Sequence, residues 1–253
     1  MKTNSPSANR RPSPRTRQPA ALRQGYGRQA AVRHKSAKAG PRRAAVVPDK
    51  PVVLFDFDGT LSAGDANTGF WKYCFRHSLR PWIFLPVVLV GVIMRGIAAI
   101  IPRRDNRVRR IDIVWRQWFR AYISPALVRK LAPGFIAEHK KNRWGWALAQ
   151  VAKERANGNI TILTSAGPDY LILPLVRDMD FDYIIASEMD PWHPWRYRFF
   201  NYMADKIDAL SPLLNGGVVV RAYSDNATDR PMMSLAREQV WIDPKTGARV
   251  SPR

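Results

Sequence analysis

Two aspartates directly follow an apolar run near the start of the sequence. The run Val52–Phe55 predicts a strand buried on both faces, as in a parallel sheet, and Asp56 and Asp58 come where this strand should end. Side chains alternate along an extended chain, so both carboxylates should point the same way. Two adjacent carboxylates repel each other unless a cation or a proton separates them. The pair suits a Mg²⁺ site at the carboxyl end of a strand, and two solvated aspartates are the alternative that this motif alone leaves open.

Further reactive side chains lie beside the ends of later predicted strands. They are the Ser165 hydroxyl, the Lys206 ammonium group, and the carboxylates of Asp225 and Asp229. The carboxyl ends of parallel strands meet at one edge of a sheet, where open α/β folds bind their ligands. The small residues after Ser165 would offer backbone N–H groups to an anion at this edge. We therefore expect these groups to form one site with Asp56 and Asp58.

Alternating strands and helices are predicted to position these groups. After the first strand, we predict strands over 159–164, 182–187, 218–223 and 239–242, helices over 66–79, 125–155, 204–214 and 230–236, and a hairpin or extended loop over 192–202. This order predicts an α/β fold with a doubly wound, mostly parallel, Rossmann-like sheet. Asp65 is suited to cap the first helix, and Lys206 lies at the start of the third.

Much of the positive charge is concentrated in the first 48 residues. The chain of 253 residues has a formal net charge of +21, and residues 1–48 contain twelve lysines and arginines but no acidic residue. This segment is rich in Pro, Ser, Ala and Gln without apolar periodicity, so we predict a disordered tail. A basic tail can touch anionic lipid or nucleic acid, or do nothing specific. We find no motif that reads a nucleic-acid groove and do not expect a nucleic-acid partner.

The rest of the chain is long enough for one core and a subdomain. Cys74 is its only cysteine, which excludes an internal disulfide and indicates a reducing compartment.

A long apolar run separates the first and second predicted strands. Residues 82–101 are long enough to cross a bilayer core, but Pro86, Gly91 and Arg95 interrupt them. The strands on either side must share one sheet, and no second apolar run follows before the next strand, so a single crossing is excluded if the fold is right. A hairpin that dips into one leaflet, an interfacial helix and a buried core helix remain. We favour the membrane-dipping interpretation.

The next segment supports contact with a membrane. Apolar residues within 103–122, two tryptophans among them, fall at helical spacing on one face. The surrounding basic residues are Arg107, Arg109, Arg110, Arg116 and Arg120. A basic amphipathic helix with tryptophans suits an anionic membrane surface. A helix packed on its own subdomain is the alternative.

In order and spacing, these motifs resemble those of the haloacid dehalogenase superfamily of aspartate-nucleophile phosphatases. The resemblance covers about residues 51–243. The four matching motifs are DFDGT over 56–60, Thr164-Ser165, Lys206, and Ser224-Asp225 with Asp229. The resemblance implies an enzyme, a Mg²⁺-dependent phosphomonoester hydrolase that works through an aspartyl-phosphate.

The resemblance also implies a role for each matching residue. Asp56 attacks phosphorus, while Asp58 protonates the leaving oxygen and then activates water. The phosphate-binding group comprises Ser165, Lys206 and Thr60, which also fixes the loop. The metal ligands would be the carboxylates of Asp56 and Asp225 and the backbone carbonyl of Asp58. Asp229 belongs to the metal site as the residue that orients metal-bound waters or Lys206. Thr228 departs from the pattern, because relatives often have Asn or Asp there.

The long insertion between the first two motifs resembles the subgroup with a helical cap, which includes phosphoserine phosphatase. The predicted division is a tail over 1–48, a core over 49–64 and 156–253, and a cap over 65–155. The apolar stretch, Tyr223 before Ser224-Asp225, and the terminal Trp241–Pro244 are similar to bacterial phosphatidylglycerophosphatases of this type.

This closer resemblance implies a phosphorylated lipid head group, such as phosphatidylglycerophosphate, as the substrate. It also implies a place on the cytoplasmic face of a bacterial inner membrane, where the enzyme is peripheral or re-entrant. The alternative is a soluble, cytoplasmic phosphatase that acts on a small phosphomonoester, as phosphoserine phosphatase does.

Overall fold

The computed structural model describes residues 50–100 and 120–251, and within them one seven-stranded sheet forms the centre of the molecule. The strands are β1 (Val52–Phe55), β2 (Ile160–Pro168), β3 (Tyr183–Met189), β4 (Tyr197–Phe199), β5 (Val219–Ser224), β6 (Ala236–Ile242) and β7 (Arg249–Val250). Their order in the sheet is β4-β3-β2-β1-β5-β6-β7. The strands from β3 to β6 in this order are parallel, and β4 and β7 add antiparallel edges.

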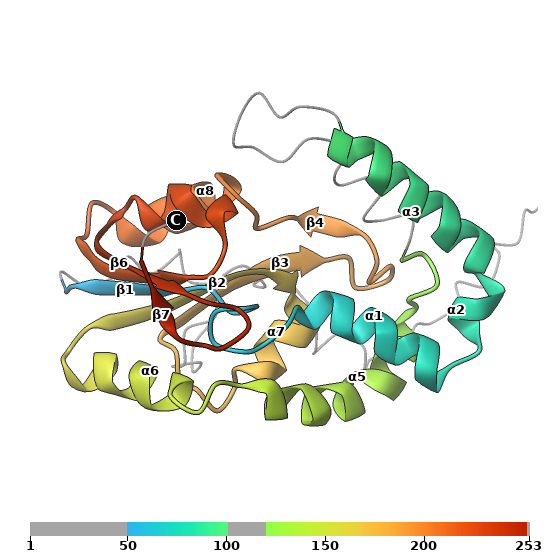
Figure 1. Cartoon of the computed structure of the whole chain (residues 1–253), viewed down its shortest axis with the longest axis horizontal. Coiled ribbons are helices and arrows are strands. Elements are labelled where there is room, and N and C mark those ends of the chain that lie inside the picture. The colour runs from blue at the N-terminus through green and yellow to red at the C-terminus, as the bar shows by residue number, and fades with distance from the viewer. Residues whose placement is uncertain (1–49, 101–119, 252–253) are drawn as a thin grey trace, which may run out of the picture.

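Helices cover both faces of the sheet (Figure 1). They are α1 (Ala66–His77), α2 (Arg80–Ile83), α3 (Leu85–Ile100), α5 (Pro125–His139), α6 (Ala147–Ala156), α7 (Asp169–Leu175), α8 (Asp205–Leu214) and α9 (Arg230–Met233), with short 3-10 turns η2 (Lys140–Asn142) and η3 (Ala227–Asp229). One apolar cluster lies between the sheet and α8 with α9, and another joins the opposite face to α1, α5, α6 and α7. The predicted doubly wound α/β fold is therefore confirmed.

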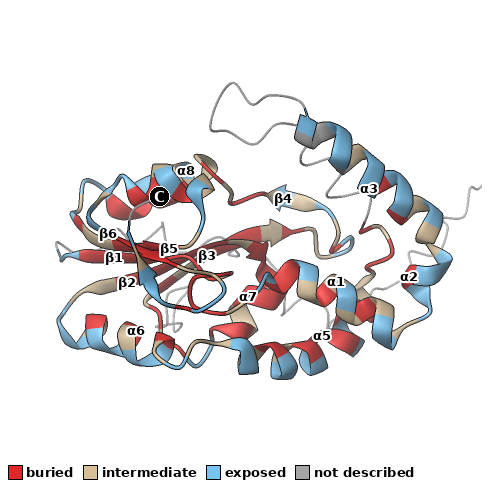
Figure 2. Cartoon of the chain, viewed as in Figure 1, coloured by how far each residue is buried: buried red, intermediate tan, exposed pale blue. Residues whose placement is uncertain are grey.

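The central strand β1 is buried on both faces. All four of its residues have no exposed surface, which explains its unbroken apolar sequence (Figure 2). It pairs in parallel with β2 on one side and β5 on the other. These pairings bring the carboxyl ends of three strands together, and the residues that follow them build the site described below.

The segment between β1 and β2 forms the insertion that contains α1 to α6. Asp65 caps α1 by accepting a hydrogen bond from the Thr68 backbone N–H, as predicted. The prediction of one continuous helix over 125–155 was wrong, because α5 ends at His139 and α6 begins at Ala147. Between them the chain turns back to the loop after β1, where the Trp144 N–H donates to the Leu61 carbonyl and Ala63 donates to Asn142. These bonds replace helical ones and tie the insertion to the loop that carries Asp58.

The apolar run divides into two helices. Pro86 is the second residue of α3, where a proline is tolerated because its missing N–H would have no helical partner, and Gly91 lies inside the helix. Large side chains of α2 and α3 are exposed, so the buried-core-helix alternative is wrong. Among the described helices, none combines the length and hydropathy needed to span a bilayer. The predicted tail and nearly all of the predicted basic helix lie outside the described residues.

Two further differences concern the C-terminal part. Strand β6 begins at Ala236, three residues before the predicted start, and shortens the predicted helix to α9. Its first residues are largely exposed, so they show no apolar signal, and pairing with β5 defines them. The antiparallel edge strand β7 was not predicted.

Candidate active site

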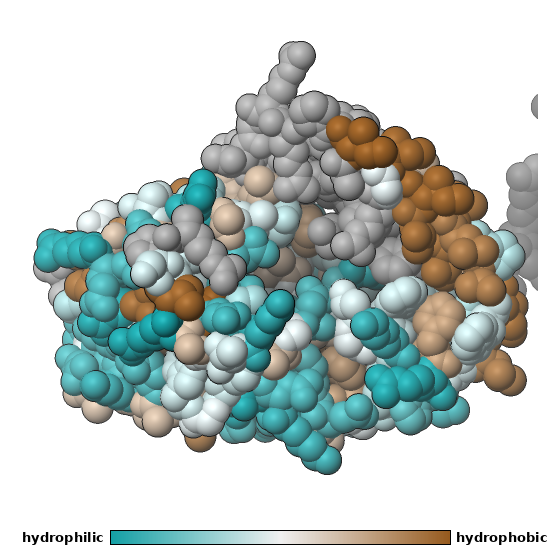
Figure 3. Space-filling model, in the orientation of Figure 1, coloured by the Kyte–Doolittle hydropathy of each residue, from teal (hydrophilic) through white to brown (hydrophobic). Residues whose placement is uncertain are grey.

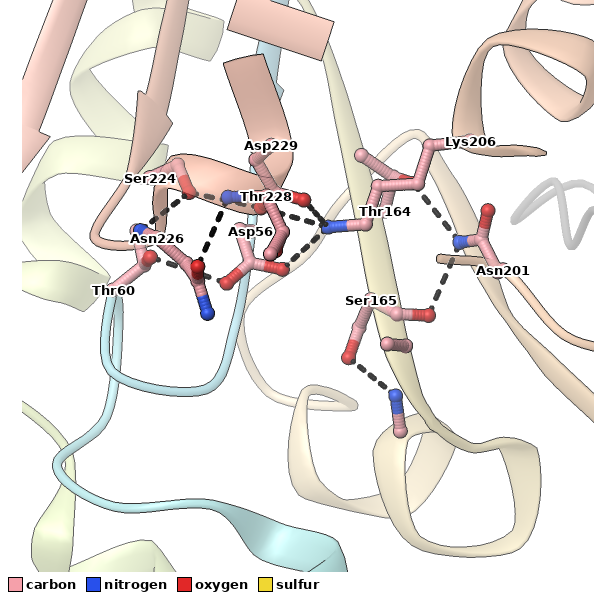
Figure 4. A network of polar contacts seen from close by, with 12 residues as sticks. Asp56, Thr60, Thr164, Ser165, Asn201, Lys206, Ser224, Asn226, Thr228 and Asp229 are labelled. Atoms are coloured by element: carbon pink, nitrogen blue, oxygen red, sulfur yellow. Dashed lines mark hydrogen bonds and ion pairs between the residues drawn. The ribbon is translucent and has the colours of Figure 1, made fainter. Parts of the chain in front are cut away.

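The carboxylate of Asp56 lies at the carboxyl end of β1 and is 7% exposed. Its backbone N–H donates to the Tyr223 carbonyl of the neighbouring β5, which fixes the residue beyond the end of the strand. The side chain accepts a hydrogen bond from Lys206 Nζ at 2.9 Å and another from the Thr60 hydroxyl at 3.2 Å (Figure 4). Both carboxylate oxygens are thus oriented by residues that the sequence predicted for the site.

Lys206 joins the acids that follow two different strands. It lies in the first turn of α8, is 1% exposed, and contacts Asp229 at 2.8 Å as well as Asp56. Asp229 also accepts a hydrogen bond from the Ser224 hydroxyl at 2.8 Å. Asp229 is therefore engaged with Lys206 and Ser224, which fits the predicted alternative in which it orients the lysine.

Asp225 closes the other side of the site. The Thr60 hydroxyl lies 3.1 Å from Asp225 Oδ1 and accepts a hydrogen bond from the Asp225 backbone N–H at 3.0 Å. Gly59 has φ +78°, and a Cβ atom there would fall 2.4 Å from Asp225 Oδ2. A side chain at this position would collide with the carboxylate, so both the backbone conformation and the space require glycine.

The carboxylates share one electrostatic environment. Burial raises the pKa of Asp56 to about 7, with Asp229 and Asp225 adding to the rise and Lys206 opposing it. Burial likewise raises the pKa of Asp225, and hydrogen bonds from Thr60 and from its own backbone oppose that shift. The same buried acids raise the pKa of Lys206, although burial alone would lower it. One buried ammonium group thus faces several acids. An additional positive charge would therefore lower the electrostatic repulsion in the site.

Asp58 lies on the side of the site that faces the insertion. Its Oδ1 accepts a hydrogen bond from the Ala66 backbone N–H at 2.7 Å, at the start of α1. Burial raises its pKa well above the ordinary value, and the charges of Asp65, Asp56 and Asp225 add to the shift. A carboxyl group whose pKa is raised in this way is suited to act as a general acid.

Ser165 lies at the edge of this group. It is fully buried near the end of β2, and its hydroxyl accepts a hydrogen bond from the Gly167 N–H at 3.0 Å. Among the described residues, the Asp56–Lys206–Asp229 contacts do not include it. The structure thus brings Ser165 beside the site but directs its hydroxyl to its own loop (Figure 4).

Asn201 was missed by the sequence analysis. This fully buried residue donates hydrogen bonds to the Thr164 hydroxyl and to the carbonyls of Ser165 and Ile185. Its backbone N–H donates to the Ser187 hydroxyl, which in turn donates to the Ala166 carbonyl. Asn201 therefore fixes the C-terminal part of β2, which contains Ser165. In the sequence it is one of several polar residues in the aromatic stretch over 192–202, and nothing there sets it apart.

Arg120 differs from its predicted place on a membrane-facing helix. It is 5% exposed, and its guanidinium group donates to the Tyr197 hydroxyl at 2.6 Å. Burial lowers the pKa of this arginine, but the neighbouring hydroxyls of Tyr197 and Tyr170, together with the charge of Asp65, raise it overall. This arginine is part of the interior between the insertion and β4, so it is not available to lipid head groups.

The donor set suits a magnesium ion. In the described part of the chain, no group of three His, Cys, Asp or Glu side chains is arranged to hold a metal. Asp56 and Asp225 both contact the Thr60 hydroxyl, so two carboxylates converge there. Mg²⁺ is bound in many sites by one or two carboxylates together with waters and substrate phosphate oxygens. The raised pKa values of these two residues show that a cation would relieve unfavourable charge.

The fold and the site define a parallel α/β enzyme core with a buried acid–lysine centre at the carboxyl edge of its sheet. Residues 53–234 match the model of the haloacid dehalogenase-like hydrolases, and the chain belongs to this family. The predicted superfamily, and with it a hydrolytic enzyme, is confirmed. The narrower assignment to phosphatidylglycerophosphatases stays a prediction.

The chain is also similar to individual proteins in sequence or in structure. Protein CicA of Caulobacter vibrioides is 25% identical over 202 residues, which cover 74% of this chain and 84% of that protein. A protein of unknown function from Bordetella pertussis Tohama I has a TM-score of 0.63 at 17% identity, covering 79% of this chain and 93% of that one. A phospho-aspartyl intermediate analogue of phosphoserine phosphatase has a TM-score of 0.50 at 16% identity, covering 79% and 91%.

Proposed function

We propose that this protein is a Mg²⁺-dependent phosphatase that hydrolyses phosphomonoesters through an aspartyl-phosphate on Asp56. The observation that carries the proposal is the orientation of the Asp56 carboxylate by hydrogen bonds from Lys206 and Thr60. A second acid, Asp58, follows Asp56 two positions later in the sequence. A buried, oriented carboxylate can act as a nucleophile, and a carboxyl group with a raised pKa can act as the acid. The phospho-aspartyl analogue described for phosphoserine phosphatase, on a similar fold, supports the same chemistry.

The reaction would proceed in two displacements. Asp56 attacks phosphorus and forms a P–O bond while the bond from phosphorus to the leaving oxygen breaks, and Asp58 gives its proton to that oxygen. The Asp58 carboxylate then takes a proton from water, whose oxygen attacks phosphorus. The bond to Asp56 breaks, inorganic phosphate leaves, and both carboxyl groups return to their initial states.

The remaining residues would balance charge and hold the phosphoryl group. Asp56, Asp225 and the Asp58 backbone carbonyl would hold Mg²⁺, which offsets the negative charge of the phosphate when bound. Lys206 is fixed between Asp56 and Asp229 and can stabilise developing negative charge on the phosphoryl oxygens. Ser165 and the N–H groups of its loop would complete phosphate binding.

We further propose a phosphorylated lipid head group as the substrate. The apolar surface of α2 and α3 supports this choice, because an enzyme for a small polar substrate has no need of it. A soluble phosphomonoester is the second candidate, and it is supported by the fold similarity to phosphoserine phosphatase. The two candidates share one reacting group and differ only in what surrounds it.

Phosphate release from matched substrates tests both parts of the proposal. Phosphatidylglycerophosphate in mixed micelles should be hydrolysed with a much higher kcat/KM than glycerol phosphate, which has the same reacting group without acyl chains. Equal or reversed preference would contradict the lipid substrate but not the phosphatase. Activity should disappear in EDTA and return with Mg²⁺, and full activity in chelator would contradict the metal site.

The nucleophile can be tested separately. Asp56→Asn keeps the shape of the side chain but removes the attacking oxygen, so turnover should fall by several orders of magnitude while the unfolding curve stays cooperative. Borohydride reduction during turnover should convert residue 56 of the wild type to homoserine, detected by mass spectrometry. A variant with near wild-type turnover, or label at another aspartate, would overturn the assignment.

A further inference from the structure

The surface formed by α2 and α3 is apolar, and no other element of the described chain covers it. Leu79 is 80% exposed, Ile83 75%, Ile93 62% and Ile100 82%. The other large apolar side chains exposed along it are Trp82, Leu89, Val90, Val92 and Ile97. Figure 3 shows hydrophobic side chains in one band over α2 and α3, which lie at the end of the molecule away from β1 (Figure 1). Apolar patches of this extent mark interaction sites.

Every residue of α3 that the structure describes as exposed is apolar or glycine. At 100° per residue its exposed positions span roughly 160° of the helix circumference, wider than the stripe that a typical surface helix buries. These positions are Pro86, Leu89, Val90, Val92, Ile93, Gly96, Ile97 and Ile100. The opposite face, with Val88 buried and Phe84 and Met94 beside it, packs on the rest of the protein. One side of the helix is thus held by the protein, and the other side faces outward.

The charges around this surface favour an anionic lipid bilayer. Residues 66–100 contain no aspartate or glutamate, and the exposed basic residues Lys72, Arg76 and Arg80 lie on α1 and at the start of α2. Basic residues near a membrane surface are attracted to anionic head groups. Trp82 is 55% exposed beside them, and tryptophan is enriched at the level of the head groups.

The dimensions favour insertion into one leaflet. α3 has 16 residues and is therefore about 24 Å long, which is shorter than the hydrocarbon core of about 30 Å. The chain must also return to the sheet, because β1 and β2 are paired neighbours. A helix anchored on the protein by one face can lie along the interface with the other face in the acyl region.

We infer that α2 and α3 form a membrane-docking surface that inserts the exposed face of α3 into one leaflet of an anionic bilayer. The purpose of this contact rests on the proposed lipid phosphatase function. The contact itself can be tested without turnover. It would hold the site close to phosphorylated head groups, so that a lipid need not leave the bilayer completely to be hydrolysed.

Vesicle sedimentation of the full chain tests the inference. The wild type and the inactive Asp56→Asn variant should bind vesicles of phosphatidylglycerol and phosphatidylcholine, and Ile93→Asp should lower the partition coefficient at least tenfold. Leu148→Asp is the matched control, because Leu148 is an exposed apolar residue of α6 and its replacement should leave binding unchanged. One series of measurements should be made at high salt, because salt screens the electrostatic attraction between the basic tail and the anionic vesicles. A cooperative urea unfolding curve like that of the wild type confirms that Ile93→Asp is folded.

A fluorescent probe locates the contact. Cys74 is buried and its pKa is raised to about 12 by burial, so an environment-sensitive label will react with Ile93→Cys in preference. Its emission should rise and shift to shorter wavelength on adding vesicles, while a label at Leu148→Cys should not respond. Unchanged binding of Ile93→Asp, or equal responses at both positions, would overturn the inference. Light scattering that shows a dimer dissociated by Ile93→Asp would also overturn it, by assigning the surface to a second copy of the chain.

Discussion

Lys206 compensates two buried acids, Asp56 and Asp229, and its removal should destabilise the protein strongly. In Lys206→Met the side chain keeps much of its volume but loses the ammonium group, which lies 2.9 Å from Asp56 and 2.8 Å from Asp229. All three side chains are less than a tenth exposed. Removing one partner of a buried ion pair costs about 3–5 kcal/mol, because the remaining charge is left without compensation. We expect a loss of this size in the free energy of unfolding at pH 8 in EDTA.

The loss should depend on pH in a defined direction. Burial and the neighbouring acids already raise the pKa of Asp56 to about 7, and without the lysine this pKa should rise further. The native state of the variant then binds more protons than the unfolded state, whose aspartates have a pKa near 3.8, so its stability falls as pH rises. The difference from the wild type should therefore be largest at pH 8 and shrink toward pH 5.

Urea denaturation followed by tryptophan fluorescence measures these differences. Lys72→Met is the matched control, since Lys72 is an exposed lysine of α1 and should change stability by no more than about 0.5 kcal/mol. The double variant Lys206→Met with Asp229→Asn should regain part of the loss, because one of the uncompensated charges is removed. A loss below about 1 kcal/mol at pH 8, or an equal loss at pH 5 and pH 8, would refute the reasoning.

Two further predictions concern single residues. Gly59→Ala places a Cβ atom 2.4 Å from Asp225 Oδ2 and displaces this carboxylate, so the Mg²⁺ concentration for half-maximal phosphate release should rise at least tenfold; an unchanged Mg²⁺ dependence would separate Asp225 from the metal. Asp169 has its pKa raised to about 6 by burial, so its carboxylate destabilises the native state as pH rises from about 4 to 6. Asp169→Asn should therefore stabilise the protein by roughly 3 kcal/mol at pH 7 and hardly at pH 4 in urea denaturation, and a gain that is equal at both pH values would contradict this sign.

The sequence predicted the parts of the site whose signals are local. The Val52–Phe55 strand, its following acids and the order of strands and helices depend on short-range periodicity and on the fixed rule that parallel strands end at one edge. Lys206 could be placed beside the acids because it begins a helix that enters from the same edge. The apolar run over 82–101 was also evident from composition, although its environment was not.

Contacts between segments far apart in the sequence were decided only by the tertiary structure. Asn201 reaches Thr164 and Ser165 in β2 across more than thirty positions, and no local pattern distinguishes such an asparagine from a solvated one. The break between α5 and α6 follows from bonds to the loop after β1, which override the local helical preference. The sequence also could not tell that Arg120 lies in the interior while Ile93 faces outward, because burial depends on which surfaces meet when the whole chain is folded.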